Sequence, residues 1–287
     1  MPLSFYDFFD ESKLKDLFAR SVDEDGAHRD ITSQLVIPSE MQGIGRIMAK
    51  QDLVLAGIEP ATRFFVYFDS EIRVEIKIED GMQMSVGDVA ATVEGSMRTL
   101  LAIERSSLNL LQYLSGIASL TAQFVERVKG TKARILDTRK TIPGMRGLEK
   151  YAVHCGGGQN HRLGLHDAIL IKDNHIAAAG GVGKAVLRAK IEGGLDRFVE
   201  VEVKDIAQLE QALDAHADRA LLDNMTPDQL AGCVERAAGR IELEASGNVT
   251  LDNIGRIART GVDFISIGAL THSAPAVDIN MKIEPKS

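Results

Sequence analysis

The first hundred residues mix helical and strand-like patterns of apolar and polar positions. Apolar residues at helical spacing predict a short helix over 13–20, and short apolar runs predict strands at 44–48, 52–55 and 89–93. Residues 72–78 alternate strictly between apolar and polar types, which is typical of a strand with one buried and one solvated face. This part of the chain is therefore expected to form a small α+β unit.

A longer helical pattern follows over 98–129, where apolar residues recur every three or four positions. Ser115 and Gly116 interrupt it, and because glycine disfavours helix interiors the pattern predicts two helices separated at these residues. At the other end of the chain, apolar and polar residues alternate over 277–283. This alternation predicts a final strand, which can return to the N-terminal sheet.

After residue 130, short apolar runs alternate with helical stretches. Six of these runs predict strands, at 133–136, 168–172, 198–203, 219–222, 241–245 and 263–267. Helix start signals stand between the later runs: Asp205, Thr226 with Pro227, and Thr250 precede the stretches 206–214, 228–237 and 251–259. Regular alternation of strands and helices predicts parallel strands with helices outside them. Because six strands are fewer than the eight of a closed barrel, we expect an open, incomplete (β/α) barrel.

The overall composition narrows the class of protein. The chain has 287 residues, with 45% hydrophobic and 26% charged residues, which is ordinary for a soluble globular protein. A net charge of -8 argues against nucleic acid as a partner. The two cysteines, Cys155 and Cys233, imply no disulfide framework, and no apolar run is long enough to span a membrane. The first ten residues do not resemble a signal peptide, so a cytoplasmic protein without a membrane partner is expected.

One segment of the chain is positively charged, although the protein as a whole is acidic. Residues 137–175 carry six Lys and Arg residues against four Asp and Glu residues, and they hold four of the seven histidines. A local cationic pocket on an acidic protein favours a small ligand with several negative charges over a long polyanion.

Polar and charged residues also gather where the predicted parallel strands end. In chain order these are Arg139 and Lys140, Lys172, Glu200 and Glu202, Asp223, Glu244 and Ser246, and Gly268. In (β/α) barrels the catalytic groups lie at the carboxyl ends of the strands. The pattern therefore indicates an active-site face.

The candidate site residues fall into three groups. The cations Arg139, Lys140, Arg162 and Lys172, with His161, suit carboxylate or phosphate ligands, although ordinary ion pairs with Asp137, Asp167 and Asp173 are the alternative. The acids Glu202 and Asp223 suit Mg²⁺ or ribose hydroxyls, or else they pair structurally with Arg or Lys. The turn Ser246-Gly247-Asn248 before Thr250 suits a phosphate at a helix N-terminus, and a plain capped turn fits these residues equally well. The glycines at 156–158 would allow the backbone to approach a ligand or another strand closely.

Taken together, these segments resemble the quinolinate phosphoribosyltransferase family, the decarboxylating enzymes of NAD biosynthesis. The matching motifs occur in order over roughly residues 100–275: Glu104–Leu111, Asp137–Thr141 with Pro143 and Gly144, Gly156–Arg162, Leu170–His175, Leu222–Asn224, Glu244–Gly247 and Ile265–His272. The N-terminal part agrees more loosely, through Asp30–Ser33, and Arg29 stands where the family usually has glycine.

The resemblance implies a fold and an assembly. It implies an N-terminal α/β sandwich domain over 1–115, joined by the tail 274–287, and an open α/β barrel over 116–273. It also implies a homodimer, or a higher oligomer, in which Arg105 reaches the site of the partner subunit.

The resemblance also implies a reaction, in which quinolinate and 5-phosphoribosyl-1-pyrophosphate (PRPP) react with Mg²⁺ to give nicotinate mononucleotide, pyrophosphate and CO₂. Arg105, Arg139, His161, Arg162 and Lys172 would bind quinolinate. Three residues would act in catalysis and bind PRPP, namely Lys140, Glu202 and Asp223, the two acids also holding the metal. The turn Ser246–Asn248 and Gly268 would take the phosphate. The alternatives are a related type II phosphoribosyltransferase acting on another base, and a non-catalytic anion-binding protein on the same scaffold.

Overall fold

The computed structural model describes residues 5–194 and 197–286. The chain divides into two compact units. The N-terminal unit contains the described residues up to Ala122, the segment Ile142–Gly157 and the tail from Ser273 onward. The barrel unit contains Gln123–Thr141 and Gly158–His272. None of the helices in the described part of the chain is long and apolar enough to cross a membrane.

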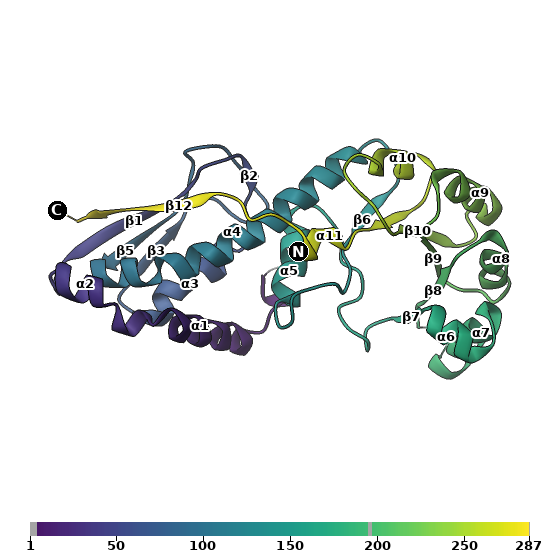
Figure 1. Cartoon of the computed structure of the whole chain (residues 1–287), viewed down its shortest axis with the longest axis horizontal. Coiled ribbons are helices and arrows are strands. Elements are labelled where there is room, and N and C mark those ends of the chain that lie inside the picture. Colours follow the sequence, from purple (N-terminus) through teal and green to yellow (C-terminus); the bar gives the residue numbers. More distant parts are fainter. Residues whose placement is uncertain (1–4, 195–196, 287) are drawn as a thin grey trace. The chain divides into compact units, whose positions relative to one another are not determined.

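The N-terminal unit is built on a four-stranded antiparallel sheet in the order β12-β1-β5-β3. Its strands are β1 (Gln42–Ala49), β3 (Arg73–Ile76), β5 (Val89–Ser96) and β12 (Ile279–Pro285), and β2 (Leu53–Val54) pairs separately with β4 (Gln83–Met84). The C-terminal strand β12 lies beside β1 (Figure 1), with Ile47 opposite Met281. The expected buried face of 72–78 is only partly present: Ile72 is buried but Ile76 is 41% exposed, because β3 is an edge strand.

Among the described residues, five α-helices and two short 3-10 helices lie wholly or mainly in this unit. They are η1 (Phe5–Asp7), α1 (Glu11–Asp25), η2 (Ala27–Arg29), α2 (Ile31–Val36), α3 (Ile58–Phe68), α4 (Met97–Arg127) and α5 (Arg146–Cys155). Helix α1 is longer than the predicted 13–20 because Asp10 caps it, accepting a hydrogen bond from the Ser12 backbone N–H.

The predicted break at Ser115 and Gly116 is wrong, because α4 continues through both residues. The Ser115 hydroxyl accepts a hydrogen bond from the Ala56 backbone N–H. At Gly116 a side chain would collide with the backbone carbonyl of Pro275 in the C-terminal tail. These small residues therefore allow neighbouring backbone to approach the helix, and they do not end it.

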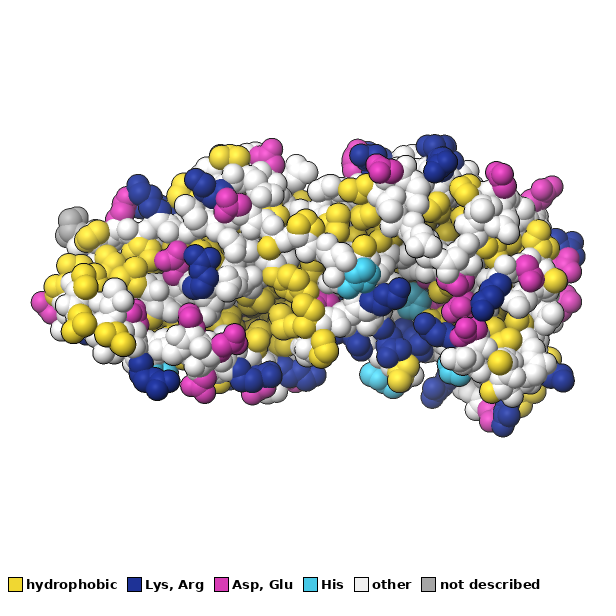
Figure 2. Space-filling model, in the orientation of Figure 1, with side chains coloured by type: hydrophobic (Ala, Val, Ile, Leu, Met, Phe, Trp, Pro, Cys, Tyr) yellow, Lys and Arg dark blue, Asp and Glu magenta, His cyan; other side chains and the backbone are white. Residues whose placement is uncertain are grey.

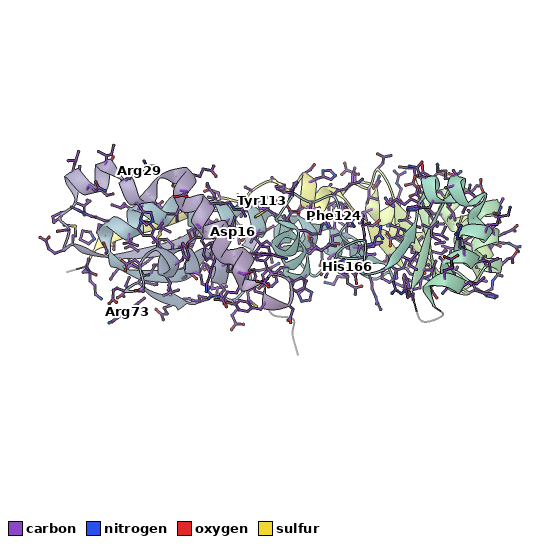
Figure 3. The ribbon with its side chains drawn as sticks, turned by 90° about the horizontal axis from the view of Figure 1, so that it is seen from below. Asp16, Arg29, Arg73, Tyr113, Phe124 and His166 are labelled. Atoms are coloured by element: carbon purple, nitrogen blue, oxygen red, sulfur yellow. The ribbon has the colours of Figure 1, made fainter. Side chains whose placement is uncertain are left out.

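The two compact units are not divided where the domains were expected to meet, at 115 and 116: the first division follows Ala122, and segment 142–157 belongs to the N-terminal unit. Helix α5 explains this. Tyr113 on α4, labelled in Figure 3, donates a 2.6 Å hydrogen bond to the buried carboxylate of Glu149. A side chain at Gly156 would collide with the carbonyl of Ala118 on the same helix. Of the three glycines at 156–158, Gly156 thus serves helix packing.

The barrel unit contains a six-stranded sheet in the order β6-β11-β10-β9-β8-β7, in which every pairing is parallel. The strands are β6 (Arg134–Leu136), β7 (Ile169–Ile171), β8 (Val199–Val203), β9 (Arg219–Asp223), β10 (Glu242–Ser246) and β11 (Phe264–Ser266). The first strand, β6, pairs with the last, β11, as in a closed barrel. Strands β6 and β7 do not pair with each other and form the two edges of the described sheet, so the barrel is open between them. The predicted open (β/α) barrel is therefore correct.

A helix follows each strand of this sheet from β7 onward, and α6 to α10 lie along the outer side of the sheet (Figure 1). They are α6 (Asp173–Ala179), α7 (Val182–Gly193), α8 (Ile206–Asp214), α9 (Pro227–Ala237), α10 (Ile254–Arg259) and α11 (Ala269–His272). The predicted caps Asp205 and Thr226 accept hydrogen bonds from the backbone N–H groups of Gln208 and Gln229. The predicted start at Thr250 is wrong: α10 begins at Ile254, after a turn over 251–253.

Candidate active site

A cavity of about 590 Å³ opens at the carboxyl ends of the strands in the barrel unit. Eleven of the twelve predicted site residues line it: Arg139, Lys140, His161, Arg162, Lys172, Glu202, Asp223, Ser246, Gly247, Asn248 and Gly268. The twelfth, Arg105, lies on α4 and lines a different cavity, of about 430 Å³, in the N-terminal unit. Figure 2 shows Lys and Arg side chains opposite Asp and Glu side chains across a hollow in the barrel unit.

Arg139 and Arg162 form the most cationic part of this cavity. The Nε atoms of both residues are buried and have no hydrogen-bond partner among the described residues. The Arg162 Nη1 donates to the carbonyl of Ala168 at 2.9 Å. Burial, and then the charge of Arg139, lower the pKa of Arg162. Two guanidinium groups with unused donors and mutual repulsion are well suited to bind an anion.

The loop that carries these cations is held by Asp137, directly after β6. This carboxylate is completely buried, and it accepts hydrogen bonds from the His161 backbone N–H at 2.9 Å and from the Asn160 side chain at 2.6 Å. Asp167 accepts a 2.7 Å hydrogen bond from the Leu163 backbone N–H in the same loop. The position of this loop can be followed in Figure 3 from the label of His166, the residue before Asp167. Asp137 and Asp167, two of the acids that could form ion pairs with the cations, thus also shape the loop.

Beneath the cations lies a buried group formed by His161 with Glu200 and Glu244, two acids that the sequence placed at strand ends without giving them a role. His161 Nε2 lies 2.9 Å from Glu200 Oε2 and 3.7 Å from Glu244 Oε2. Arg219 Nη1 lies 3.4 Å from the same Glu244 oxygen and its guanidinium stacks on the ring of Phe264. Burial, and then the charge of Glu200, raise the pKa of Glu244 to about 8. Burial likewise raises the pKa of Glu200.

The alternating pattern of strand β8 accounts for the position of Glu200. Strand β8 reads Val-Glu-Val-Glu-Val, and alternate residues of a strand share a face. Its three valines are fully buried, while Glu200 and Glu202 share the face that carries the site. The difference between them is depth: Glu200 is buried, whereas Glu202 is partly exposed in the cavity.

Glu202 and Asp223 provide the acidic side of the cavity. Burial, and then the charge of Asp223, raise the pKa of Glu202, while Lys172 lowers it. Two carboxylates that repel each other in one cavity gain from a shared cation. The Asp223 carboxylate also accepts a 2.9 Å hydrogen bond from the Asn224 side chain.

The turn after β10 packs tightly against the turn after β9. Asn248 donates its side-chain N–H to the Asn224 Oδ1 at 3.0 Å, and both asparagines have left-handed backbones, with φ of 52° and 54°. Gly247 has φ of 98°, and a side chain there would collide with Asn224. The turn does not form the N-terminus of a helix as predicted, because α10 begins only at Ile254.

Lys140 and Gly268 meet at the end of β11. A side chain on Gly268 would come within 2.9 Å of the Lys140 Cδ and 3.2 Å of the His272 Nε2. Thr271 donates its hydroxyl to the Lys140 carbonyl at 2.7 Å. The glycine therefore leaves room for the lysine stem. His272 also lines the cavity, and its place in the last matching motif is its one signal in the sequence.

Comparisons with known proteins agree with this architecture. The family models described as "Quinolinate phosphoribosyl transferase, N-terminal domain" and "C-terminal domain" match residues 30–115 and 117–282. The chain is similar to the nicotinate-nucleotide pyrophosphorylase [carboxylating] of Mycobacterium leprae, with 42% identity over 94% of this chain and 96% of that protein. A probable enzyme of the same name from Bacillus subtilis is 40% identical over 94% and 93% of the two chains.

Solved structures give the same result. The crystal structure of NadC from Streptococcus pyogenes matches with a TM-score of 0.92 and 39% identity, over 97% of this chain and 99% of that one. The nicotinate-nucleotide pyrophosphorylase of Francisella tularensis matches with a TM-score of 0.90 and 37% identity, over 96% and 98%. With both domain models matched and relatives of this identity aligned over nearly their whole length, the chain belongs to the quinolinate phosphoribosyltransferase family.

Proposed function

We propose that the protein transfers the phosphoribosyl group of PRPP to quinolinate with loss of CO₂, giving nicotinate mononucleotide and pyrophosphate for NAD biosynthesis. One observation carries the proposal: a single cavity joins two arginines that have unused buried donors to a pair of mutually repelling acids. The first feature suits a dicarboxylate and the second suits a ribose with its metal. The relatives named above carry the same activity in their names.

The cationic side binds quinolinate in this proposal. Arg139 and Arg162 supply planar forks for its two carboxylates, and Lys172 adds a mobile positive charge. A base with one carboxylate needs fewer cations, so their number favours quinolinate over nicotinate. His161 fixes this side of the cavity from beneath.

The acidic side holds the ribose and the metal. Glu202 and Asp223 fit a Mg²⁺ ion, because a divalent cation would relieve the repulsion that raises the pKa of Glu202. When bound, the ion would neutralise charge on the pyrophosphate. Lys140 faces the same group, and the turn Ser246–Asn248 with Gly268 receives the 5′-phosphate.

The residues of the cavity then act by position and charge. As pyrophosphate leaves C1′, positive charge develops on the ribose, and the carboxylates of Glu202 and Asp223 stabilise it. The quinolinate nitrogen bonds to C1′ and becomes cationic. The ring then accepts the electron pair of the departing 2-carboxylate, which is lost as CO₂, and a proton takes its place. No covalent nucleophile is needed, because the site holds both reactants in line.

The assembly in the proposal is a homodimer, in which the partner's Arg105 completes the quinolinate site. Its support is that Arg105 is exposed on α4 and lines a cavity of the N-terminal unit, while the other cations line the barrel cavity. The two cysteines are free thiols, which favours a reducing compartment such as the cytoplasm.

The test is a product assay with two candidate bases. The protein is incubated with PRPP and Mg²⁺ and with either quinolinate or nicotinate, and nicotinate mononucleotide is measured by chromatography. We expect product from quinolinate, and little or none from nicotinate. Efficient use of nicotinate with no turnover of quinolinate would overturn the proposal in favour of a related phosphoribosyltransferase.

A further inference from the structure

The side chain of Asn224 ties strands β9 and β10 together just past their paired residues. Asp223 lies opposite Ser246 at the end of the two strands, and the Asn224 backbone N–H donates to the Ser246 carbonyl at 2.9 Å. The Asn224 Nδ2 lies 2.9 Å from the Asp223 Oδ2, and its Oδ1 lies 3.0 Å from the Asn248 Nδ2. These two side-chain hydrogen bonds form a bridge between an acid of the cavity and the turn after β10.

The chemistry of these groups fixes the direction in which both amides face. Because a carboxylate accepts hydrogen bonds, Asn224 turns its NH₂ group toward Asp223 and its oxygen toward Asn248. Asn248 then donates through its own NH₂ group. Asn253 donates its side-chain N–H to the Asn248 carbonyl at 2.8 Å and accepts from the Thr250 backbone N–H at 2.8 Å. The hydrogen bonds of the bridge therefore run without conflict from the turn to the Asp223 carboxylate.

The backbone around this bridge is shaped to bring the two asparagines together. Asn224 and Asn248 both have left-handed backbones, a conformation that asparagine tolerates better than most residues. A side chain at Gly247, between the two strands' ends, would collide with the Asn224 amide oxygen. Both asparagines are exposed, so their hydrogen bonds compete with water and add little to the stability of the fold. A role in ligand binding therefore accounts better for this geometry than a role in folding.

We propose that Asn224 is a positioning residue, which sets the distance between the ribose-binding acid Asp223 and the turn that receives the 5′-phosphate. The described residues that line the cavity do not include Asn224, so it acts through its two neighbours. The hydroxyls and the phosphate of a ribose 5-phosphate group are a fixed number of bonds apart. Two subsites held at the matching distance bind both ends at once, and the turn needs no ordering when the ligand arrives. This inference rests on the proposed function.

The first experiment compares two ligands that differ by one phosphate group. Nicotinate mononucleotide and nicotinate riboside share the base and the ribose, and only the mononucleotide carries the 5′-phosphate. Their Kd values are measured by calorimetry without Mg²⁺ and without PRPP, so that no turnover is involved. Asn224→Gly removes the side chain and keeps the left-handed backbone. We expect the Kd of the mononucleotide to rise about tenfold, the scale on which residues that orient binding groups act, and the Kd of the riboside to change much less.

Two further variants and a third ligand serve as controls. Ala238→Gly places glycine at another left-handed position, at the end of α9, and should bind both ligands as the wild type does. Asn248→Gly removes the same bridge from its other end, so it tests the inference even if Asn224→Gly folds poorly, and we expect the same selective loss of the mononucleotide. Phthalate, a dicarboxylate without the ring nitrogen that quinolinate uses to react, should bind all three variants with the wild-type Kd.

A double-mutant cycle then shows whether the two asparagines act together. If they act through one bridge, adding Asn224→Gly to Asn248→Gly should cause no further loss of affinity for the mononucleotide. Additive losses would mean that the two side chains act independently, and would overturn the proposal. Equal losses of the mononucleotide and the riboside in Asn224→Gly, or no loss of either, would overturn it as well.

The same measurements separate this inference from the proposed function. If the wild type binds the mononucleotide more tightly than the riboside, and Asn224→Gly does so to the same extent, the phosphate site stands and the positioning role of Asn224 fails. If the wild type binds both ligands equally, the phosphate site of the proposed function fails, and the inference fails with it.

Discussion

Replacing Arg162 by alanine should weaken quinolinate binding without weakening the fold. The Arg162 Nε is buried and has no hydrogen-bond partner within the described part of the chain, while its Nη1 donates to the carbonyl of Ala168. Burial, and then the opposing charge of the neighbouring Arg139, lower the pKa of Arg162. Removing the side chain therefore takes away repulsion along with one hydrogen bond, and the thermal midpoint should stay level or rise slightly.

The expected loss of affinity follows from the remaining donors. A hydrogen bond to a charged group contributes roughly 1.5–3 kcal/mol. At about 1.4 kcal/mol for each factor of ten, one such contact corresponds to a roughly 10- to 100-fold rise in the quinolinate KM. Arg162→Lys keeps the charge but loses the planar fork, so its KM should fall between those of the wild type and the alanine variant.

The assay combines steady-state kinetics with thermal unfolding of the same preparations. The KM for PRPP should change little, because Arg162 belongs to the carboxylate side of the cavity. A lowered thermal midpoint with an unchanged quinolinate KM would show that Arg162 stabilises the fold and does not bind a carboxylate of quinolinate.

Four further changes test other parts of the site. Glu202→Gln should raise the KM for PRPP and weaken the response to Mg²⁺ while leaving the phthalate Kd unchanged; a selective loss of phthalate binding would contradict its place on the ribose side. Gly268→Ala should raise the KM for PRPP several-fold, because its new methyl group must displace the stem of Lys140, and kinetics equal to the wild type would argue against close packing there. Arg105→Ala should regain activity in mixed dimers with a barrel-site variant, whereas a failure to regain any would count against a shared site. Glu244→Gln should make the thermal midpoint fall less steeply with rising pH. The pKa of Glu244 is raised from its ordinary value of 4.5 to about 8 in the folded protein, so this carboxyl lowers the stability of the fold as pH rises through that range. An unchanged slope of thermal midpoint against pH would disprove this role.

The barrel was predictable because its signals are local. Each of its six strands lies in a short segment rich in apolar residues, and Asp205 and Thr226 cap the helices that follow two of them. Charged residues at the strand ends then located the cavity, since parallel strands bring those ends to one edge.

What the sequence left open depended on tertiary contacts. The tight packing of Gly116 against the tail is invisible until the tail is placed, so a glycine suited to close approach looked like a helix break. The assignment of α5 to the N-terminal unit rests on contacts with α4, as in the hydrogen bond from Tyr113 to Glu149. Burial also separates Glu200 from Glu202, which the alternating pattern of β8 places on the same face.

This cavity should couple phosphoribosyl transfer to loss of the 2-carboxylate of quinolinate. The most direct measurement uses quinolinate labelled in that carboxyl group and follows labelled CO₂ and pyrophosphate together, with PRPP and Mg²⁺ present. The two products should appear in equal amounts, and omitting PRPP should abolish both. Release of pyrophosphate without labelled CO₂, or of CO₂ without PRPP, would contradict this coupling.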